Sequence, residues 1–88
     1  MLDTSKIKNK EKMKNTIDLI QIAQTGANLI IDCKSKSIID LIQIVTIVGI
    51  NDAHITIKNA QTLTTLDIIQ IAKIYPKNIT FEFLNDYE

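Results

Sequence analysis

The longest apolar stretch of the chain, residues 38–50, is interrupted by polar side chains at a fixed interval. Together with Ser37, which precedes the stretch, Asp40, Gln43 and Thr46 place a polar residue at every third position. This spacing is close to the 3.6-residue period of an α-helix and is incompatible with the two-residue alternation of a strand. The pattern therefore predicts a helix, although so many isoleucines are more typical of strands.

The same segment occurs three times. It reads DLIQIA from Asp18, DLIQIV from Asp40 and DIIQIA from Asp67, at intervals of 22 and then 27 residues. Each copy is followed by a short turn containing Gly, Pro or Asn, and then by a segment with the pattern of a strand: LIIDC, AHITIK or ITFEF. Self-similarity at this period indicates stacked supersecondary units, so we expect three helix–strand repeats.

Residues at the ends of the predicted helices fit their positions. Ser37, and either Thr64 or Thr65, are expected N-caps. The repeated aspartate then falls in the first turn, where a carboxylate interacts favourably with the helix dipole. Gly26 and Gly49 are expected to end the first two helices as C-caps.

The alternation of helices with strands predicts an α/β fold: three helix–strand repeats that form a parallel three-stranded sheet through right-handed crossovers. The middle helix is the most apolar copy, with Ile38 and Val45 where the first has Thr16 and Ala23. A helix that is apolar on more sides is buried on more sides. We therefore expect the units to lie side by side in sequence order, with the middle helix between the other two.

Alternation within the strands separates two faces of the predicted sheet. The apolar face contains Leu29, Ile31, Ile55, Ile57, Ile79, Phe81 and Phe83, and the polar face contains Asp32, His54, Thr56, Lys58, Thr80 and Glu82. A parallel sheet covered on both sides would instead have continuously apolar strands. We therefore expect all helices to pack on the apolar face and the polar face to be open as a candidate binding surface, with Ile30 as its apolar exception.

The stretch ITIKNAQTLTTLDIIQIAKIYPKNITFEF places a strand, a polar turn at Asn59 and a helix before the next strand, and Cys33 stands near the corresponding turn of the preceding copy. Over residues 28–83 this layout resembles the leucine-rich repeats, particularly their cysteine-containing type, with isoleucine in place of leucine. The resemblance implies sequential helix–strand units and, by analogy, binding of a partner through the strand face. It transfers no functional residue.

A chain of 88 residues is long enough for one domain. We assign residues 15–88 to a single α/β repeat domain, and residues 1–14 to a lysine-rich N-terminal segment that frays or extends the first helix from about Met13. Ten lysines balance ten acidic residues, so no net charge attracts nucleic acid or an anionic membrane, and we expect neither as a partner. Lysine without arginine, with abundant isoleucine and asparagine, is typical of an AT-rich genome.

Cys33 is the only cysteine, which excludes an internal disulfide and a zinc site built on paired thiolates. No apolar segment of the kind found in a secretory signal follows the first residues. The longest apolar run is also shorter than the about 20 residues that cross a bilayer. These features predict a soluble, cytoplasmic protein.

Few residues could support catalysis or cofactor binding. Cys33 and His54 are the only thiol and imidazole, and strand alternation places them on opposite faces of the sheet. Asp18, Asp40 and Asp67 could form a row of carboxylates for a cation, but neighbouring helix axes lie about 8–10 Å apart, and stabilisation of helix N-termini explains the repeat better. No glycine-rich phosphate loop is present. We therefore expect no enzymatic activity, no metal and no cofactor.

The aromatic residues Tyr75, Phe81, Phe83 and Tyr87 all belong to the last repeat. They could form a bulky cap on one end of the aliphatic core or an aromatic binding box. The cap is the favoured interpretation, because large aromatic side chains contribute mostly through buried area.

Three functions fit these observations. The leading hypothesis is a small non-catalytic protein–protein interaction module that presents the open polar sheet face to a partner protein. The alternative is a self-assembling structural protein, a homo-oligomer that associates through the unpaired edges of the first and third strands. The third is a small enzyme or ligand-binding domain whose type the sequence does not specify.

Overall fold

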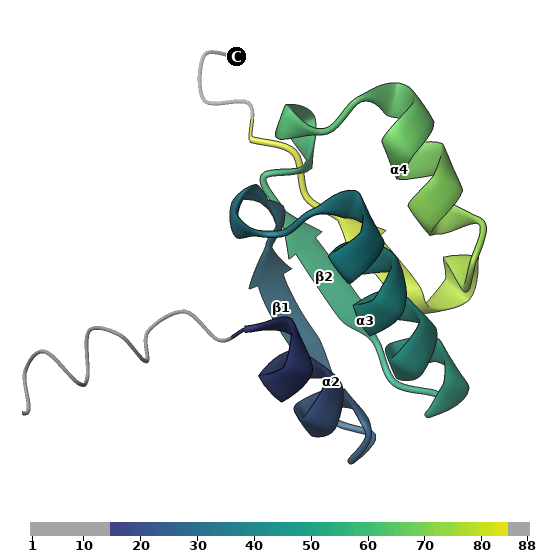
Figure 1. Cartoon of the computed structure of the whole chain (residues 1–88). Helices are drawn as coiled ribbons and strands as arrows, with labels where there is room; N and C mark the ends of the chain where they lie inside the picture. The colour runs from purple at the N-terminus through teal and green to yellow at the C-terminus, as the bar shows by residue number, and fades with distance from the viewer. Residues whose placement is uncertain (1–14, 85–88) are drawn as a thin grey trace, which may run out of the picture.

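The computed structural model describes residues 15–84 and alternates helices and strands as the sequence predicts (Figure 1). The helices and strands are α2 (Thr16–Ala23), β1 (Leu29–Asp32), α3 (Ile38–Ile50), β2 (Ile55–Lys58), α4 (Thr65–Ala72) and β3 (Ile79–Phe81). Three short 3₁₀ turns, η1 (Cys33–Ser35), η2 (Ala60–Thr62) and η3 (Pro76–Asn78), lie in the connections and had no signal in the hydrophobic pattern.

Each helix begins at a side chain that caps its first turn. The Asp40 N–H donates to Ser37 Oγ (3.1 Å) and the Asp67 N–H donates to Thr64 Oγ1 (3.1 Å), which confirms Ser37 and selects Thr64 over Thr65. Asn15 caps α2 in the same way, since it accepts from the Asp18 N–H (2.8 Å). A cap of this kind contributes about 1 kcal/mol to stability. The predicted fraying or helical extension of residues 1–14 lies outside the described residues.

The three strands form one parallel sheet in the order β1-β2-β3. Leu29 pairs with Ile55, and Ile55 pairs with Ile79, so equivalent positions of the repeats lie side by side across the sheet. The predicted sequence order of the units is therefore confirmed. Side chains of one repeat consequently continue as rows across its neighbours.

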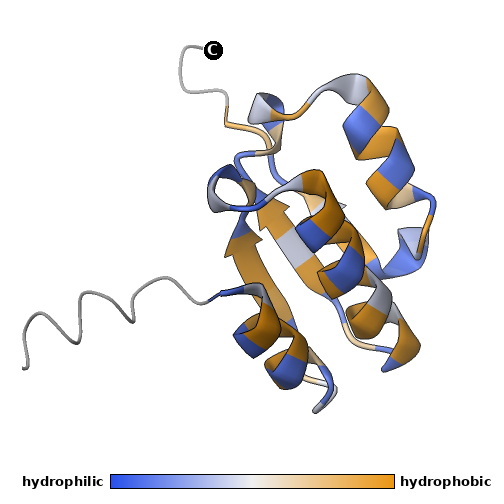
Figure 2. Ribbon diagram, in the orientation of Figure 1, coloured by the Kyte–Doolittle hydropathy of each residue, from blue (hydrophilic) through white to orange (hydrophobic). Residues whose placement is uncertain are grey.

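The three helices of residues 15–84 cover one face of the sheet, with α3 between α2 and α4 (Figure 1). Figure 2 shows the strands largely in orange beneath helices whose outer surfaces are banded with blue. The core consists of strand residues such as Ile55 and Ile57 together with Leu41, Ile44 and Val45 of α3, all fully buried. Burial of α3 exceeds that of α2 and α4, which confirms the interpretation of its more apolar sequence.

The predicted strand ITFEF is shorter in the structure, because β3 ends at Phe81. Its last ladder bonds join the Glu82 N–H to Ile57 O (2.9 Å) and the Ala60 N–H to Glu82 O (3.0 Å). β2 ends at Lys58, and the chain then turns at Asn59, which has a left-handed backbone (φ 62°). Phe83 therefore has no strand of the sheet beside it. The assignment of Phe83 to the covered apolar face was wrong: its side chain is 47% exposed.

The expected role of Gly49 as a C-cap was also wrong. α3 continues past it to Ile50, and Asn51 is the C-cap. Gly49 instead allows a close approach, because a Cβ at this position would overlap the ring of Tyr75. Gly26 does lie in the turn after α2, two residues beyond the C-cap Gln24, where its φ of 87° favours glycine.

Candidate functional site

The six predicted surface residues lie on the sheet face that no described helix covers. This open face is defined by Asp32, His54, Thr56, Lys58, Thr80 and Glu82, with Ile30 as its apolar member. Strand pairing arranges them in rows, since Asp32 pairs with Lys58 and Thr56 pairs with both Ile30 and Thr80. Parallel pairing in register therefore brings together residues from all three repeats.

A charged row crosses the ends of the strands. Lys58 lies between two carboxylates: it is the register partner of Asp32, and its Nζ lies 3.8 Å from Glu82 Oε1. Both side chains of the Lys58–Glu82 pair are about half exposed. An exposed pair of this kind contributes at most about 1 kcal/mol to stability, so its charges can be redirected towards a partner at little cost.

Asp32 is held more firmly than its exposure suggests. Its Oδ1 accepts from the Lys34 N–H (2.8 Å), which caps η1, and its Oδ2 accepts from Asn59 Nδ2 (2.7 Å). The bond from the Lys34 backbone chiefly lowers the pKa of the Asp32 carboxyl; desolvation opposes the change, and the Asn59 bond and the charges of Lys34 and Lys58 add to it. Asp32 is thus an ionised carboxylate with a fixed orientation.

His54 directly precedes β2 and contacts β3, at the end of the open face opposite the charged row. Its Nε2 lies 2.7 Å from Thr80 Oγ1, and the tautomer of the ring decides which of the two donates. Its backbone is also anchored, because the His54 N–H donates to Asn28 Oδ1 (2.8 Å). The imidazole is therefore positioned by its neighbours on the sheet surface.

Ile30 stands out among the polar residues of the open face. Its side chain is 72% exposed on β1, an edge strand of the sheet. Single exposed apolar residues are common on protein surfaces and need no special explanation. Ile30 is thus an exposed apolar side chain on an otherwise polar face.

Cys33 and His54 lie apart, as alternation predicts. Cys33 is buried, and its Sγ lies 3.2 Å from Asn59 O and 3.4 Å from Thr62 Oγ1, whereas His54 contacts Thr80 on the open face. The thiol is thus part of a polar contact between η1 and η2. The geometry provides no nucleophile–base pair from these two residues.

Asn59 makes contacts that join neighbouring repeats, whereas the sequence predicted it only as a residue of a polar turn. Its side chain bonds Asp32, its carbonyl accepts from Cys33 Sγ and Thr62 Oγ1 (2.8 Å), and its left-handed backbone adds one residue between β2 and η2. The available signal was an asparagine directly after a strand, since Asn tolerates positive φ better than most residues. The contact with Asp32 depends on strand pairing and had no local signal.

The aromatic residues mainly fill space. Tyr75 packs against Gly49, and Phe81 lies partly buried against the core, whereas Phe83 is exposed and Tyr87 lies outside the described residues. Within residues 15–84 this arrangement favours the cap interpretation over an aromatic box.

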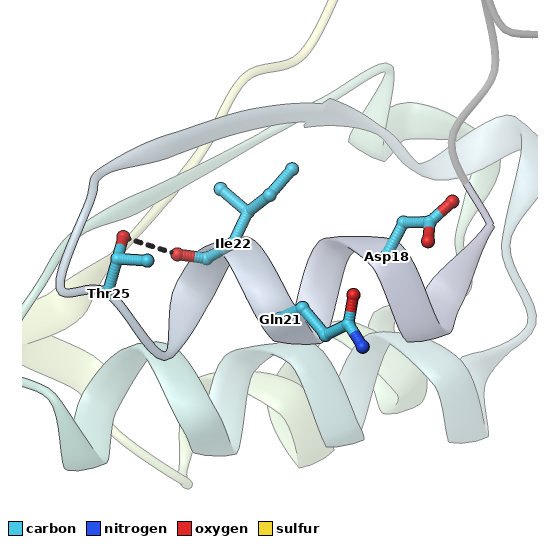
Figure 3. A pocket seen from close by; sticks show the side chains of 4 residues that line it. All are labelled: Asp18, Gln21, Ile22 and Thr25. Atoms are coloured by element: carbon cyan, nitrogen blue, oxygen red, sulfur yellow. Dashed lines mark hydrogen bonds between the residues drawn. The ribbon is translucent and has the colours of Figure 1, made fainter.

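The surface also has a hollow of about 320 Å³ along α2 (Figure 3). It is lined by Asp18, Gln21, Ile22 and Thr25, which all come from α2 and the turn after it. No cluster of three or more His, Cys, Asp or Glu side chains that could hold a metal occurs among residues 15–84. In the same part of the chain, no helix is long and apolar enough to cross a membrane.

Comparison with known proteins identifies no relatives: no family model, no curated protein and no solved structure matches the chain.

Proposed function

We propose that the protein is a small non-catalytic binding module whose open face contacts a partner protein. The observation that carries the proposal is the one-sided sheet, on which three repeats contribute adjacent polar side chains while α2, α3 and α4 lie on the other side. A parallel sheet normally has both faces covered, so the exposed face with its polar rows is a candidate binding surface. Its likeness in layout to leucine-rich repeats supports the same use by analogy.

The dimensions of the face favour a weak, transient contact. Strands of three and four residues are roughly 10–13 Å long, and three strands about 4.8 Å apart add a similar width. This area is well below the roughly 800 Å² that each partner contributes to a standard stable interface. The partner must therefore be slender, or its contact must continue beyond the six residues over Ile30 at the sheet edge.

The charges of the face indicate what a partner would present. Two carboxylates, Asp32 and Glu82, accompany one ammonium group, Lys58. These three groups together carry a net negative charge, so an Arg or Lys of the partner is the favoured neighbour for this row. An apolar side chain beside Ile30 would complete the contact.

The test is a quantitative pull-down from the source cell's lysate with matched variants. The test variant combines His54→Ala, Lys58→Ala and Glu82→Ala, and the control combines Gln21→Ala, Gln43→Ala and Gln70→Ala on exposed positions of the helices. We expect the test variant to lose a few kcal/mol of binding free energy in total and the control to lose none. Equal retention of the same partner by both variants would remove the open face as the binding surface.

Self-association is a second candidate, favoured by the sheet edges. β1 and β3 each have one side without a neighbouring strand among residues 15–84. Unpaired backbone groups at such edges can pair with another chain.

A further inference from the structure

The position of Gly49 shows which side of α3 faces α4 and which side faces α2. Tyr75, which follows α4, lies so close to Gly49 that a Cβ there would overlap its ring. Ile42 precedes Gly49 by about two helical turns and so lies on the same side of α3, facing α4. Ile44 lies about 200° around the helix from Ile42 and therefore faces α2.

Residues equivalent to Ile44 show that one side of α2 has no helix beside it among residues 15–84. Counted from the repeated aspartate, they are Ile22 in α2 and Ile71 in α4. Ile44 and Ile71 are fully buried because a preceding helix lies beside them, whereas Ile22 is 39% exposed. Ile22 lines the hollow of Figure 3 together with Asp18, Gln21 and Thr25.

Residues equivalent to Ile42 reveal the complementary flank on α4. Ile20 and Ile42 are partly buried against the core, each with a following helix beside it. Their equivalent Ile69 is 44% exposed, because no helix follows α4 among residues 15–84. The α4 end of the molecule thus exposes the side that would contact a following helix, and the α2 end exposes the side that would contact a preceding helix.

The sheet edges match in the same way. Leu29, Ile55 and Ile79 occupy equivalent positions in one continuous register. A further strand beside β3 in this register would place its own Leu29 next to Ile79. The interface that already occurs twice within the chain can therefore continue into a second molecule.

We propose that a second copy of the chain occupies these ends head-to-tail, with Ile69 of one copy packed against Ile22 of the next. The proposal rests on self-association, the second candidate function. Charge supports this direction: residues 1–14, which lead into α2, carry five lysines against Asp3 and Glu11, while the end of the sequence carries Asp86 and Glu88. Because the contacting surfaces differ, the assembly is open-ended unless its rotation closes a ring.

One pair of charges limits the strength of this contact. The open-face row that contains Asp32, Lys58 and Glu82 would continue with Asp32 of the next copy, which places two carboxylates side by side. Charged residues commonly restrain edge strands from pairing. Replacing Glu82→Gln should therefore strengthen association, whereas an assembly through other surfaces would not respond.

Sedimentation velocity of the full chain at increasing concentration tests the proposal, with Ile22→Asp and Ile69→Asp as test variants. Ile17→Asp is the matched control, because Ile17 is also an exposed isoleucine of α2 but lies away from this flank. We expect each test variant to raise the dissociation constant about tenfold or more, since a charge replaces an apolar interface contact. The control should associate as the wild type does.

Cross-linking provides a readout that is independent of variant stability. Chains with Ile22→Cys mixed with chains with Ile69→Cys should form a disulfide-linked dimer, and chains with Ile17→Cys in place of Ile22→Cys should not. A wild type that is monomeric at every concentration would overturn both the proposal and self-association. Association that persists in both aspartate variants, without the specific cross-link, would overturn the proposal alone.

Discussion

The contact between Gly49 and Tyr75 predicts that Gly49→Ala lowers stability when the Tyr75 ring is present and raises it when the ring is removed. Gly49→Ala in the last turn of α3 should gain up to about 1 kcal/mol from helix propensity alone. The new methyl group would, however, overlap the first atoms of the Tyr75 ring, which cannot move without leaving its packed position. Such overpacking costs about 1–3 kcal/mol. We expect a net loss of about 1 kcal/mol.

Removal of the ring should reverse the effect. In a Tyr75→Ala background the overlap is absent, so Gly49→Ala should stabilise the protein by the propensity term of about 1 kcal/mol. The expected coupling between the two sites is therefore about 2 kcal/mol, well within the range measured for residues in contact. Urea denaturation of the wild type, both single variants and the double variant measures it. Equal effects of Gly49→Ala in the two backgrounds would refute the proposed contact.

Other substitutions test separate parts of the fold. Ser37→Ala should destabilise the protein by about 1 kcal/mol in urea denaturation, because the Asp40 N–H loses its cap, and Ser37→Asp should restore most of the loss. Ile44→Ala should cost about 2–5 kcal/mol and Ile22→Ala under about 1 kcal/mol in dilute protein, since only the first leaves a fully enclosed cavity; similar losses would contradict the assigned flanks. Asp32 has a lowered pKa in the folded state, so its stabilising contribution is present above the unfolded pKa of 3.8 and is lost as the pH falls through the folded value. Thermal unfolding against pH should therefore show a shallower acid decline for Asp32→Asn than for the wild type, and parallel curves would show that the charge has no such role.

The sequence was most informative where side chains repeat with a period. Polar residues at every third position in residues 38–50 and the alternation in ITIK predicted elements that the structure contains, and the one-sided alternation predicted the helices on a single face. Each of these patterns arises because one side of a helix or strand is buried, so that every position along the element is apolar or polar according to the side on which it lies.

Features that depend on a single distant contact had no comparable signal. Gly49 is a glycine because of Tyr75, 26 positions further along the chain, and β3 ends where its partner strand turns at Asn59. The cap Asn15 follows directly on a lysine-rich segment without hydrophobic periodicity. Local propensity describes a residue and its sequence neighbours, whereas these features are set by tertiary packing.

The candidate site shows the same division. Membership of the open face followed from alternation, so Thr56 and Lys58 could be assigned to it from the sequence. The contacts within the face could not, because the His54–Thr80 and Asp32–Asn59 hydrogen bonds depend on the register between strands. These contacts also separate the residues by role: Asp32 is largely engaged within the fold, while the exposed Lys58–Glu82 pair remains adjustable.

The most direct test of the open face as the binding surface is residue-level mapping of the captured partner's footprint. Amide chemical shifts of the isotopically labelled chain would be followed by NMR as the partner is added. We expect the changes to concentrate at His54, Thr56, Lys58 and Thr80 and to leave the exposed helix positions Gln21, Gln43 and Gln70 unaffected. Changes confined to the helices, with the strand amides unmoved, would contradict the account.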